Sequence, residues 1–516
     1  MSVVIARPPS LFLIFWLPAL VLLAGVLAIT PLSPLLLAIA AITGALLLVR
    51  WPWLIWLGIA ATLPVSSGMK FGPASVTDLL LAIACALWFA NGVRRKTLRL
   101  QGSLVVSLLL VYISILYLSL LTAVNLGEAT VEVVKWLEVV IVLLLVRAMV
   151  TKAQASWLVA ALLFGGVSQA LLGLYQFIFR IGPSWFIILG RFMRASGSFH
   201  QPNPYAGYLG LCLPVAASLA LWAWGEVVQR VTRRKQSSDQ LSVSADVSIG
   251  RDQGSGVDRD PELVTDHWSL ITVSALFYTL ATGLTALALL ASWSRGGWFG
   301  AAVGVGIVLI LRSRLAALMG VVVVLLTLVA LLLGSFKPGM MPAPLVARLQ
   351  EVPAYFGLTD IVNEPVNDDN FAVIERVAHW VAAVRMWEKA PWLGVGPGNY
   401  AVVYPSVHLP RWDEPLGHAH NIYLNVLAET GILGLGAYSL LWITVIGWVW
   451  RCFRQTVRRQ QGWNAALTIG VLGVIGHLSV HNVFDNLFVQ GMYIQIGLWL
   501  ALVAIVAAPD AALSSG

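Results

Sequence analysis

The sequence predicts an all-α fold: a polytopic membrane bundle of about fourteen transmembrane helices, with twelve as the lower count, and one large folded outer loop. Of the 516 residues, 59% are hydrophobic and only 11% are charged, and the mean hydropathy is +0.84. Charged residues make up roughly a quarter of an ordinary soluble chain. The apolar residues also gather in runs of about 20, long enough for a helix to cross roughly 30 Å of hydrocarbon with its backbone fully hydrogen-bonded.

Fourteen apolar runs account for the predicted helices. The first follows Arg7 and resembles a signal peptide, but it lacks a clear small-residue cleavage site and more spans follow, so we expect a retained helix. The third and tenth runs are short. In order, the spans are expected at residues 11–29, 32–49, 51–65, 76–92, 104–123, 131–149, 155–178, 205–227, 268–291, 297–311, 315–334, 421–449, 464–482 and 486–506.

Five clusters of basic residues beside the predicted helices fall on one side of this arrangement. Lysine and arginine concentrate in cytoplasmic loops, so we expect both chain termini and these clusters to lie in the cytoplasm. The net charge of +8 would also suit a nucleic-acid partner, but topology explains most of it and we expect no such partner. The clusters are Arg94, Arg95 and Lys96; Arg147 and Lys152; Arg230, Arg233, Arg234 and Lys235; Arg312 and Arg314; and Arg451, Arg454, Arg458 and Arg459.

Two segments between spans are long enough to form units of their own. Residues 229–267 are rich in Ser, Asp and Gly and show no apolar period, which predicts a disordered cytoplasmic linker. Residues 335–420 contain prolines, aromatics and a helical pattern, so we expect a folded outer domain. The chain therefore divides into a transmembrane bundle at 1–334, which carries the linker, the loop domain at 335–420 and C-terminal transmembrane helices at 421–516.

Four arginines stand on outer connections, where the charge bias disfavours them: Arg180, Arg191, Arg194 and Arg295. Such side chains can snorkel to lipid headgroups or pair with a carboxylate, which requires no function. Arg194 and Arg295, however, lie near span ends beside small residues, in RASG and SRGG, where a ligand can approach closely. A guanidinium binds phosphate through two parallel hydrogen bonds, which favours a lipid-linked phosphate or diphosphate. Arg191 and Asn203 are further candidate substrate contacts on the same connection.

The segment GHAHNIYLNVLAETGILG lies where the outer domain re-enters the membrane. We expect His420 to begin a helix on which Asn421, Asn425 and Glu429 form a polar stripe at spacings of four. Polar groups in a span cost free energy unless they have partners, which makes the stripe a candidate site. A single histidine is often structural, but His420 stands at the water boundary beside His418. We expect His420 to be catalytic, with His418, Asn421 and Asn425 as candidate substrate contacts.

Residues 371–400 predict an amphipathic helix lying over the bundle, followed by a turn. Valines and tryptophans repeat with the helical period, while Glu375, Arg376 and His379 fall off that face. The run LGVGPGNY that follows resembles a nucleotide-binding loop only superficially, because no strand precedes it. We expect a tight turn there. The aromatic residues of this region would suit either stacking on sugars or a belt at the membrane interface.

Two sets of residues have metal-ligand character. His477, His481 and Asp485 are spaced by four on one predicted helix face, which suits zinc. No further ligand set accompanies them, and such histidines can instead bond to one another, to backbone or to substrate. The adjacent acids of the outer loop, such as Asp413 with Glu414, are more typical of a solvated loop. The three cysteines lie far apart, without metal-ligand spacing, and suit small core positions. We therefore expect no metal and no cofactor.

Taken together, these segments resemble the O-antigen ligase and O-antigen polymerase superfamily of bacterial membrane glycosyltransferases. The motifs that carry the resemblance stand in the family's order between residues 194 and 434, with a large outer loop before the last spans. They are RASGSFHQPNPYAGYL, SWSRGG, ERVAHWVAAVRMWEKAPWLGVGPGNY and HAHNIYLNVLAETGILG.

The resemblance implies a multi-pass protein of the bacterial inner membrane whose active site faces the periplasm. It implies a glycan donor on undecaprenyl diphosphate, with Arg194 and Arg295 binding the diphosphate, Arg376 matching a further family arginine, and His420 acting as base. The reaction would be a metal-independent single displacement that inverts the anomeric carbon. The acceptor stays open between a lipid-core sugar, the end of a growing polymer and a protein side chain.

A membrane transporter or flippase is the alternative function. Its arginines would bind an anion or a lipid-linked phosphate, and the His477 face would carry protons. That reading accounts for the histidines inside a span, but not for a folded outer loop that ends in a histidine. The sequence therefore favours the glycosyltransferase.

Overall fold

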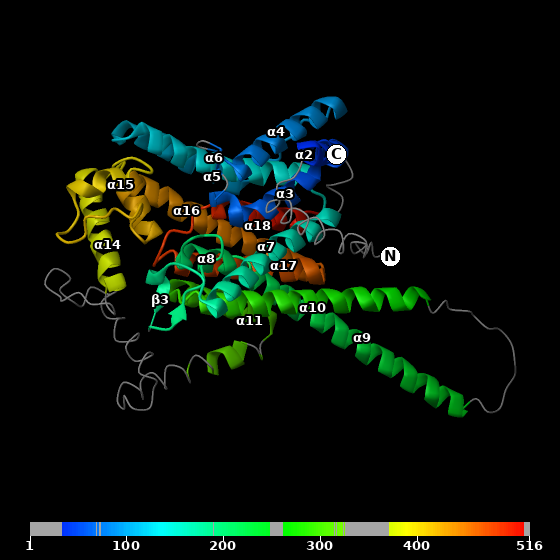
Figure 1. Ribbon diagram of the computed structural model, residues 1–516. Coiled ribbons are helices and arrows are strands. Elements are labelled where there is room, and N and C mark those ends of the chain that lie inside the picture. Colours follow the sequence, from blue (N-terminus) through cyan, green and yellow to red (C-terminus); the bar gives the residue numbers. More distant parts are fainter. Residues whose placement is uncertain are drawn as a thin grey trace, which may run out of the picture.

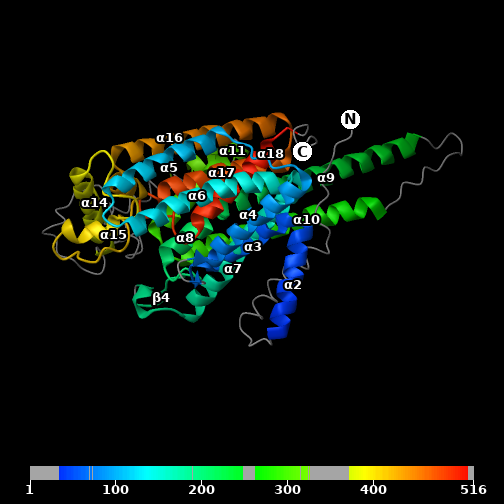
Figure 2. The ribbon, with the colours of Figure 1, turned by 90° about the horizontal axis from the view of Figure 1, so that it is seen from above.

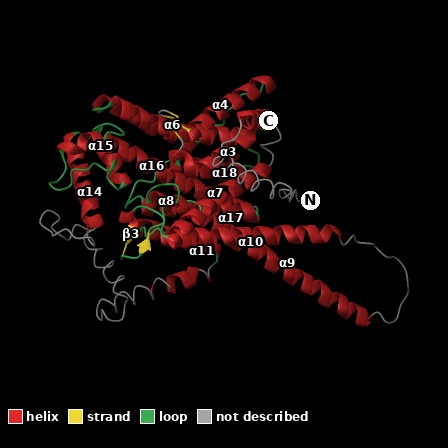
Figure 3. Ribbon diagram, in the orientation of Figure 1, coloured by secondary structure: helices red, strands yellow, loops and turns green. Residues whose placement is uncertain are grey.

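The computed structural model shows the predicted all-α membrane architecture. Helices make up most of the part of the chain that is described, together with two small hairpins and the connecting loops (Figure 3). In the hairpins, β1 (Lys70–Phe71) pairs with β2 (Ala74–Ser75), and β3 (Ile187–Ile188) pairs with β4 (Phe192–Met193), both antiparallel. The structure describes residues 34–68, 70–71, 74–188, 190–247, 262–313, 371–509 and a few positions between 315 and 325.

Eight helices in this described part are long and apolar enough to cross a membrane. Those spans are formed by α4 (Val76–Arg95), α5 (Leu104–Leu118) with η3 (Ser119–Thr122), α7 (Lys152–Phe179), α8 (Pro202–Gly210) with α9 (Leu213–Val247), α10 (Glu262–Ala291), α11 (Arg295–Arg312), α16 (Ile422–Arg458) and α17 (Gly462–His481). The remaining apolar helices of the bundle are α2 (Pro34–Arg50), α3 (Ile55–Thr62) between η1 (Pro52–Leu54) and η2 (Leu63–Gly68), α6 (Leu126–Met149) and α18 (Met492–Ala507).

Twelve of the fourteen expected spans coincide with these helices. The expected span at 11–29 and most of the one at 315–334 lie outside the described residues. The last helix begins at Met492 rather than at residue 486, because residues 482–491 form a loop. In that loop the side-chain oxygens of Asn482 and Asn486 accept the backbone N–H groups of Leu487 and Phe488, both at 2.9 Å.

The helices reach further into the expected linker than the sequence indicates. Helix α9 continues to Val247 and α10 already begins at Glu262, so the prediction of disorder over the whole of 229–267 is wrong for the two ends of that segment. Residues 248–261 lie outside the described residues. The polar, charged composition that suggested a linker does not prevent an existing helix from continuing by several turns, because propagation is much easier than nucleation.

Helix α17 lies at the centre of the bundle and packs against α9, α11 and α16. Small residues allow this close approach, as expected for helix packing within a membrane. A Cβ added to Gly304 of α11 would lie 2.6 Å from the carbonyl oxygen of Gly473 in α17. The cysteines are free, and Cys212 and Cys452 are buried, in agreement with the expected core role.

The outer connections and the basic loops lie at opposite ends of the bundle. Helix α14 (Phe371–Lys389), α15 (Tyr400–Val403) with η7 (Tyr404–Ser406), and the β3–β4 hairpin gather at one end, and the long extensions of α9 and α10 project from the other (Figures 1 and 2). Near that other end Lys152 Nζ donates to Ala508 O at 2.6 Å, and Arg459 Nη1 donates to Ala507 O at 3.0 Å. The loops assigned to one side of the membrane are therefore close to one another in space.

The described part of the outer loop is folded, and the expected tight turn is present. Its glycines adopt positive φ angles, +66° at Gly394 and +102° at Gly396. The turn docks on α16, where the backbone N–H of Gly396 donates to Glu429 O at 2.9 Å. A Cβ on Gly394 would lie 2.2 Å from the carbonyl carbon of Glu429, so only glycine fits. This run is a packing element of the outer domain. The part of the expected domain at 335–370 lies outside the described residues.

Candidate active site

The loop between α17 and α18 carries a buried carboxylate toward the outer domain. Asp485 is 4% exposed, and its Oδ1 accepts the backbone N–H of Asn486 at 2.8 Å. The same oxygen lies 3.5 Å from His420 Nδ1 and 3.6 Å from His418 Nε2. The expected helix face of His477, His481 and Asp485 is therefore divided, because α17 ends at His481 and Asp485 turns toward the two histidines of the outer loop.

His420 precedes α16 rather than beginning it. Asn421 is the N-cap of that helix, and its side-chain oxygen accepts the N–H groups of Tyr423 and Leu424 at 3.0 and 3.1 Å. His420 itself has a φ of +50°, an uncommon conformation that its surroundings must hold in place. Both of its ring nitrogens are enclosed and, within the described residues, neither makes a hydrogen bond. Nδ1 faces Asp485 at 3.5 Å, and Nε2 has no hydrogen-bond partner among the described residues.

Contacts with backbone determine the tautomer of His418. Its Nδ1 accepts the backbone N–H of His420 at 3.0 Å, so in the neutral ring the proton sits on Nε2, which faces Asp485. Burial, followed by the charge of His420, lowers the pKa of His418 to about 4, and His418 is therefore neutral near pH 7. Neutral His418 supports the carboxylate without competing with His420 for a proton.

Asp485 is a carboxylate across the physiological range. Burial raises its pKa, but the contact with His420 and the charges of His420 and His418 outweigh burial and hold the pKa below its ordinary value. The separation of 3.5 Å from His420 is longer than a good hydrogen bond. Catalytic hydrogen bonds are often long before substrate binds and then shorten. The pair is arranged to stabilise a positive charge that forms on His420.

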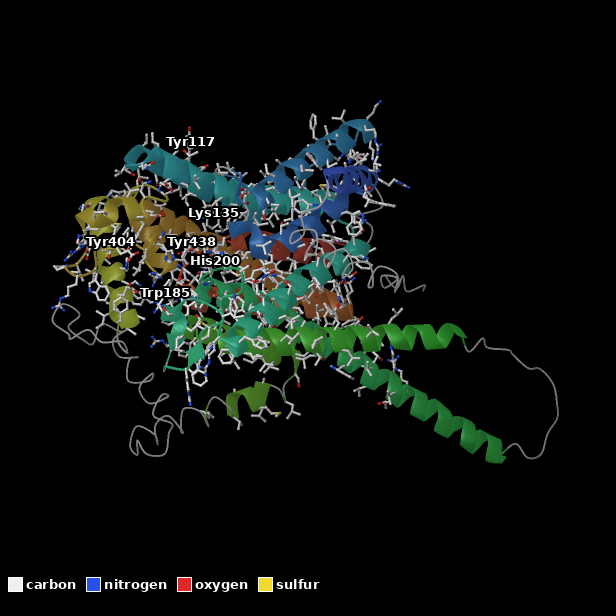
Figure 4. The ribbon with its side chains drawn as sticks, in the orientation of Figure 1. Tyr117, Lys135, Trp185, His200, Tyr404 and Tyr438 are labelled. Carbon is white, nitrogen blue, oxygen red and sulfur yellow. The ribbon has the colours of Figure 1, made fainter. Side chains whose placement is uncertain are left out.

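The rings of His379 in α14, Tyr400 in α15 and Tyr404 in η7 pack together beside His420. His379, which the sequence placed off the apolar face, is 1% exposed, so that placement is wrong. Its Nδ1 lies 3.0 Å from Tyr400 Oη, its ring stacks on Tyr404 at 4.6 Å, and its edge meets the ring of His420 at 5.7 Å. Burial lowers the pKa of His379 to about 3. Tyr404 lies inside the outer domain (Figure 4), and Tyr400 and Tyr404 are both buried and pack as core, whereas Trp392 is exposed.

Arg194 is held against the turn between α10 and α11. Its Nε donates to Ser292 O at 3.0 Å and its Nη2 donates to Asn203 Oδ1 at 3.2 Å. Arg295 is the first residue of α11, directly after Ser294, whose Oγ accepts the N–H of Gly297 at 3.3 Å as N-cap. Asn203 therefore orients Arg194, and the two predicted diphosphate ligands belong to one packed unit.

The first turn of α11 in turn contacts the loop that carries Asp485. A Cβ added to Gly296 would lie 2.9 Å from His481 Cδ2 and 3.0 Å from Phe484 Cβ. From the other side, Arg376 Nε donates to Phe484 O at 3.2 Å. Residues 481–485 thus bring together the turn that bears Arg295, the guanidinium of Arg376 and the pair formed by Asp485 and His420.

Other predicted residues have structural partners. Asn425 Oδ1 accepts the N–H of Ala419 at 3.0 Å, and Glu429 Oε1 accepts the N–H of Tyr400 at 3.2 Å. The polar stripe of α16 therefore shapes the way the outer domain joins the helix. Arg191 lies exposed on the β3–β4 hairpin, with its guanidinium 4.6 Å from the centre of the Phe192 ring.

A cation site is chemically conceivable at the same place. In the part of the chain that the structure describes, the group of three able to hold a metal is His418, His420 and Asp485, whose ligand atoms lie within 4.8 Å of one another. Two imidazole nitrogens and a carboxylate oxygen are suitable zinc ligands. This set differs from the helix face of His477, His481 and Asp485 that was considered from the sequence, and it shares only Asp485 with that face.

A charged face inside the bundle was not predicted from the sequence. On α6, Lys135 Nζ lies 2.5 Å from Glu132 Oε1, and Glu138 Oε2 accepts the hydroxyl of Tyr493 at 2.9 Å. Figure 4 shows Lys135 and Tyr438 in the interior of the bundle. The signal was present in EATVEVVKWLEVV, where charged residues recur at spacings of three and four within an otherwise apolar run.

Residues 280–439 match the family model described as O-antigen ligase. The match includes Arg295, Arg376, His418 and His420, and the chain extends beyond it at both ends. No curated protein matches the chain. The match confirms the predicted resemblance to the O-antigen ligase and O-antigen polymerase superfamily. The match and the eight apolar helices together support a membrane protein that is similar to the O-antigen ligases.

Proposed function

We propose that this protein acts as an enzyme of the O-antigen ligase and O-antigen polymerase superfamily and moves a glycan from an undecaprenyl-diphosphate donor to an acceptor hydroxyl at the periplasmic face of the inner membrane. The observation that carries the proposal is that residues 481–485 contact both the turn that begins at Arg295 and the guanidinium of Arg376, and also include Asp485, the partner of His420. This arrangement supports a role for these arginines as cations that hold a phosphorylated leaving group near a candidate base.

His420 acts as the general base. Its Nδ1 faces Asp485, so its Nε2 takes the proton of the acceptor hydroxyl as the acceptor oxygen attacks the anomeric carbon. Histidine is the side chain that most often serves as a general base in enzymes. The Asp485 carboxylate holds the ring in position and stabilises the imidazolium that forms. His418, neutral near pH 7, faces the same carboxylate at 3.6 Å.

Arg194 and Arg295 hold the diphosphate. A bond forms between the acceptor oxygen and the anomeric carbon while the bond from that carbon to the diphosphate oxygen breaks, and the lipid diphosphate departs with the electron pair. Each well-placed donor contributes about 3 kcal/mol to stabilising the charge that develops. Arg376, on the opposite side of the loop, adds a third cation. The guanidinium groups supply the positive charge that a metal would otherwise provide, and a single displacement inverts the anomeric carbon.

The proposed orientation of the protein in the membrane rests on the distribution of its basic loops. We place 335–420 in the periplasm and 229–267 in the cytoplasm, with both chain termini cytoplasmic, because the basic loops then lie inside. The acceptor is a lipid-core sugar, the end of a growing polymer or a protein side chain. Arg191, Asn421 and Asn425 are candidate contacts to these substrates.

The test compares transfer with donor binding in His420→Ala. Loss of a general base lowers kcat by roughly a hundred- to ten-thousandfold and leaves ground-state donor contacts in place. Transfer from a purified undecaprenyl-diphosphate glycan is measured with each acceptor class, and donor binding is measured separately. His200→Asn is the control, because His200 is exposed and its φ of +57° is one that asparagine tolerates. Undiminished transfer by His420→Ala would overturn the assignment of the base.

A further inference from the structure

Two buried histidines of α17 have no part in the chemistry described so far. His477 and His481 are fully buried, and His481 Nδ1 lies 3.4 Å from His477 Nε2. Ionisable side chains inside a span are costly and require a reason. Their place in the fold supplies one, because both rings stand at the junction of the elements that carry the candidate site.

On one side the two rings contact α11. A Cβ on Gly300 would lie 2.7 Å from His477 Nδ1, and a Cβ on Gly296 would lie 2.9 Å from His481 Cδ2 and 3.3 Å from its Nε2. These separations are shorter than nearly all real contacts of a Cβ atom. The imidazole of His481 therefore determines how closely the first turn of α11 approaches α17, and Arg295 is the residue directly before Gly296.

On the other side His481 leads to the base. It is the last residue of α17, and the loop that follows brings Asp485 to 3.5 Å from His420. Phe484, in the same loop, also touches the turn at Gly296 through its Cβ. His481 thus lies between the element that bears Arg295 and the residue that orients His420.

We propose that His481 is a positioning residue that sets the distance between Arg295 and the pair of Asp485 and His420. The inference rests on the proposed glycosyl transfer and adds a residue that determines its geometry. Both partners must act on one substrate in the transition state, and a misplacement of about 1 Å can cost a hundredfold in rate.

The position of Arg194 gives this inference a specific kinetic signature. Arg194 is bonded to Ser292 O in the same turn that leads into α11, so Arg194 and Arg295 move together when α11 shifts. Ground-state contacts to the diphosphate are then retained while the distance to His420 changes. We expect kcat to fall while the donor KM changes little.

Gly296→Ala is the test, with Gly306→Ala as the matched control. The methyl at 296 must push against His481 and Phe484, whereas a Cβ on Gly306 of the same helix meets nothing within 4 Å. We expect Gly296→Ala to lower kcat about 10- to 100-fold with the donor KM within about threefold, and Gly306→Ala to match the wild type.

Substitutions of His481 complete a double-mutant cycle. His481→Asn retains a nitrogen near the Nδ1 position but removes the atoms that face Gly296, while His481→Gln reaches toward the Nε2 position. We expect the glutamine variant to retain more activity than the asparagine variant, and Gly296→Ala to cost less in the His481→Asn background than in the wild type.

The outcomes separate this inference from the function on which it rests. Additive effects on kcat, or a Gly296→Ala enzyme as fast as Gly306→Ala, overturn the positioning role while leaving glycosyl transfer in place. An equal loss in the asparagine and glutamine variants that tracks only a lower melting temperature also overturns it. A wild type that transfers no glycan overturns the proposed function and this inference with it.

Discussion

Replacing Asp485 by asparagine isolates the electrostatic part of the proposed mechanism. Asparagine keeps the size and one carbonyl-type oxygen of aspartate but removes the negative charge. In the proposed reaction that charge acts on the imidazolium formed at His420, 3.5 Å away. Two unit charges at this distance attract by about 1 kcal/mol in bulk water and by about 5 kcal/mol at an effective dielectric constant of 20.

The burial of the pair places the effect between these limits. The side chain of Asp485 is 5% exposed and that of His420 is 17% exposed, so neither is fully hydrated. A loss of roughly 2 to 4 kcal/mol in the transition state corresponds to a decrease in kcat of about 30- to 1,000-fold. The donor KM should change little, because Asp485 is not among the residues proposed to hold the diphosphate.

Initial rates over a range of donor concentrations provide the assay. Asp413→Asn is the control, because Asp413 is an exposed acid of the same outer domain. Circular dichroism and the melting temperature show whether each variant is folded. If folded Asp485→Asn turns over within threefold of the wild type, the charge of Asp485 does not support catalysis and the reasoning from the geometry fails.

Three other predictions follow from the charge arrangement. Arg194→Lys and Arg295→Lys each raise the donor KM at least about tenfold, because an ammonium keeps the charge but loses the planar fork; wild-type turnover at limiting donor would indicate lipid-headgroup contacts instead. A cysteine at Ser335 is labelled by an impermeant thiol reagent in cells whose outer membrane has been permeabilised, and one at Ser238 is not; the reverse pattern contradicts the topology. Because burial lowers the pKa of His379 to about 3, the unfolded chain binds more protons than the folded protein between about pH 6.5 and pH 3. The contribution of His379 to the free energy of unfolding is therefore complete above about pH 6.5 and falls as the pH drops. A melting temperature that rises on acidification over this range would contradict the burial of His379.

Hydropathy was sufficient to predict the helices, because a membrane span needs only length and apolar composition. It could not predict where α17 ends. The spacing of four residues predicted a helix that continues past His481, with Asp485 on one face with His477 and His481. In the structure the side-chain oxygens of Asn482 and Asn486 accept hydrogen bonds from backbone N–H groups of the following loop, so the chain leaves the helix axis of α17.

Several residues of the candidate site could be predicted from the sequence, but the contacts between them could not. The outer position of the arginines, which the charge bias disfavours, identified Arg194 and Arg295 without any knowledge of their neighbours. The burial of His379 was not predicted, because a polar residue in an amphipathic helix is expected on the solvent-facing side. Its cover comes from Tyr400 and Tyr404, more than 20 residues later in the chain, and such tertiary contacts leave no periodic signal in a sequence.

Glycan transfer by the purified protein in the presence of a chelator tests the central claim most directly. Because guanidinium groups are proposed to hold the leaving diphosphate, the wild type should transfer glycan from undecaprenyl diphosphate to an acceptor with EDTA present, at the rate seen without it. Activity that EDTA abolishes and zinc restores would instead assign His418, His420 and Asp485 to a metal. If no acceptor receives glycan, while reconstituted vesicles move an anion or a lipid-linked phosphate across the bilayer, the protein is a transporter and the account is contradicted.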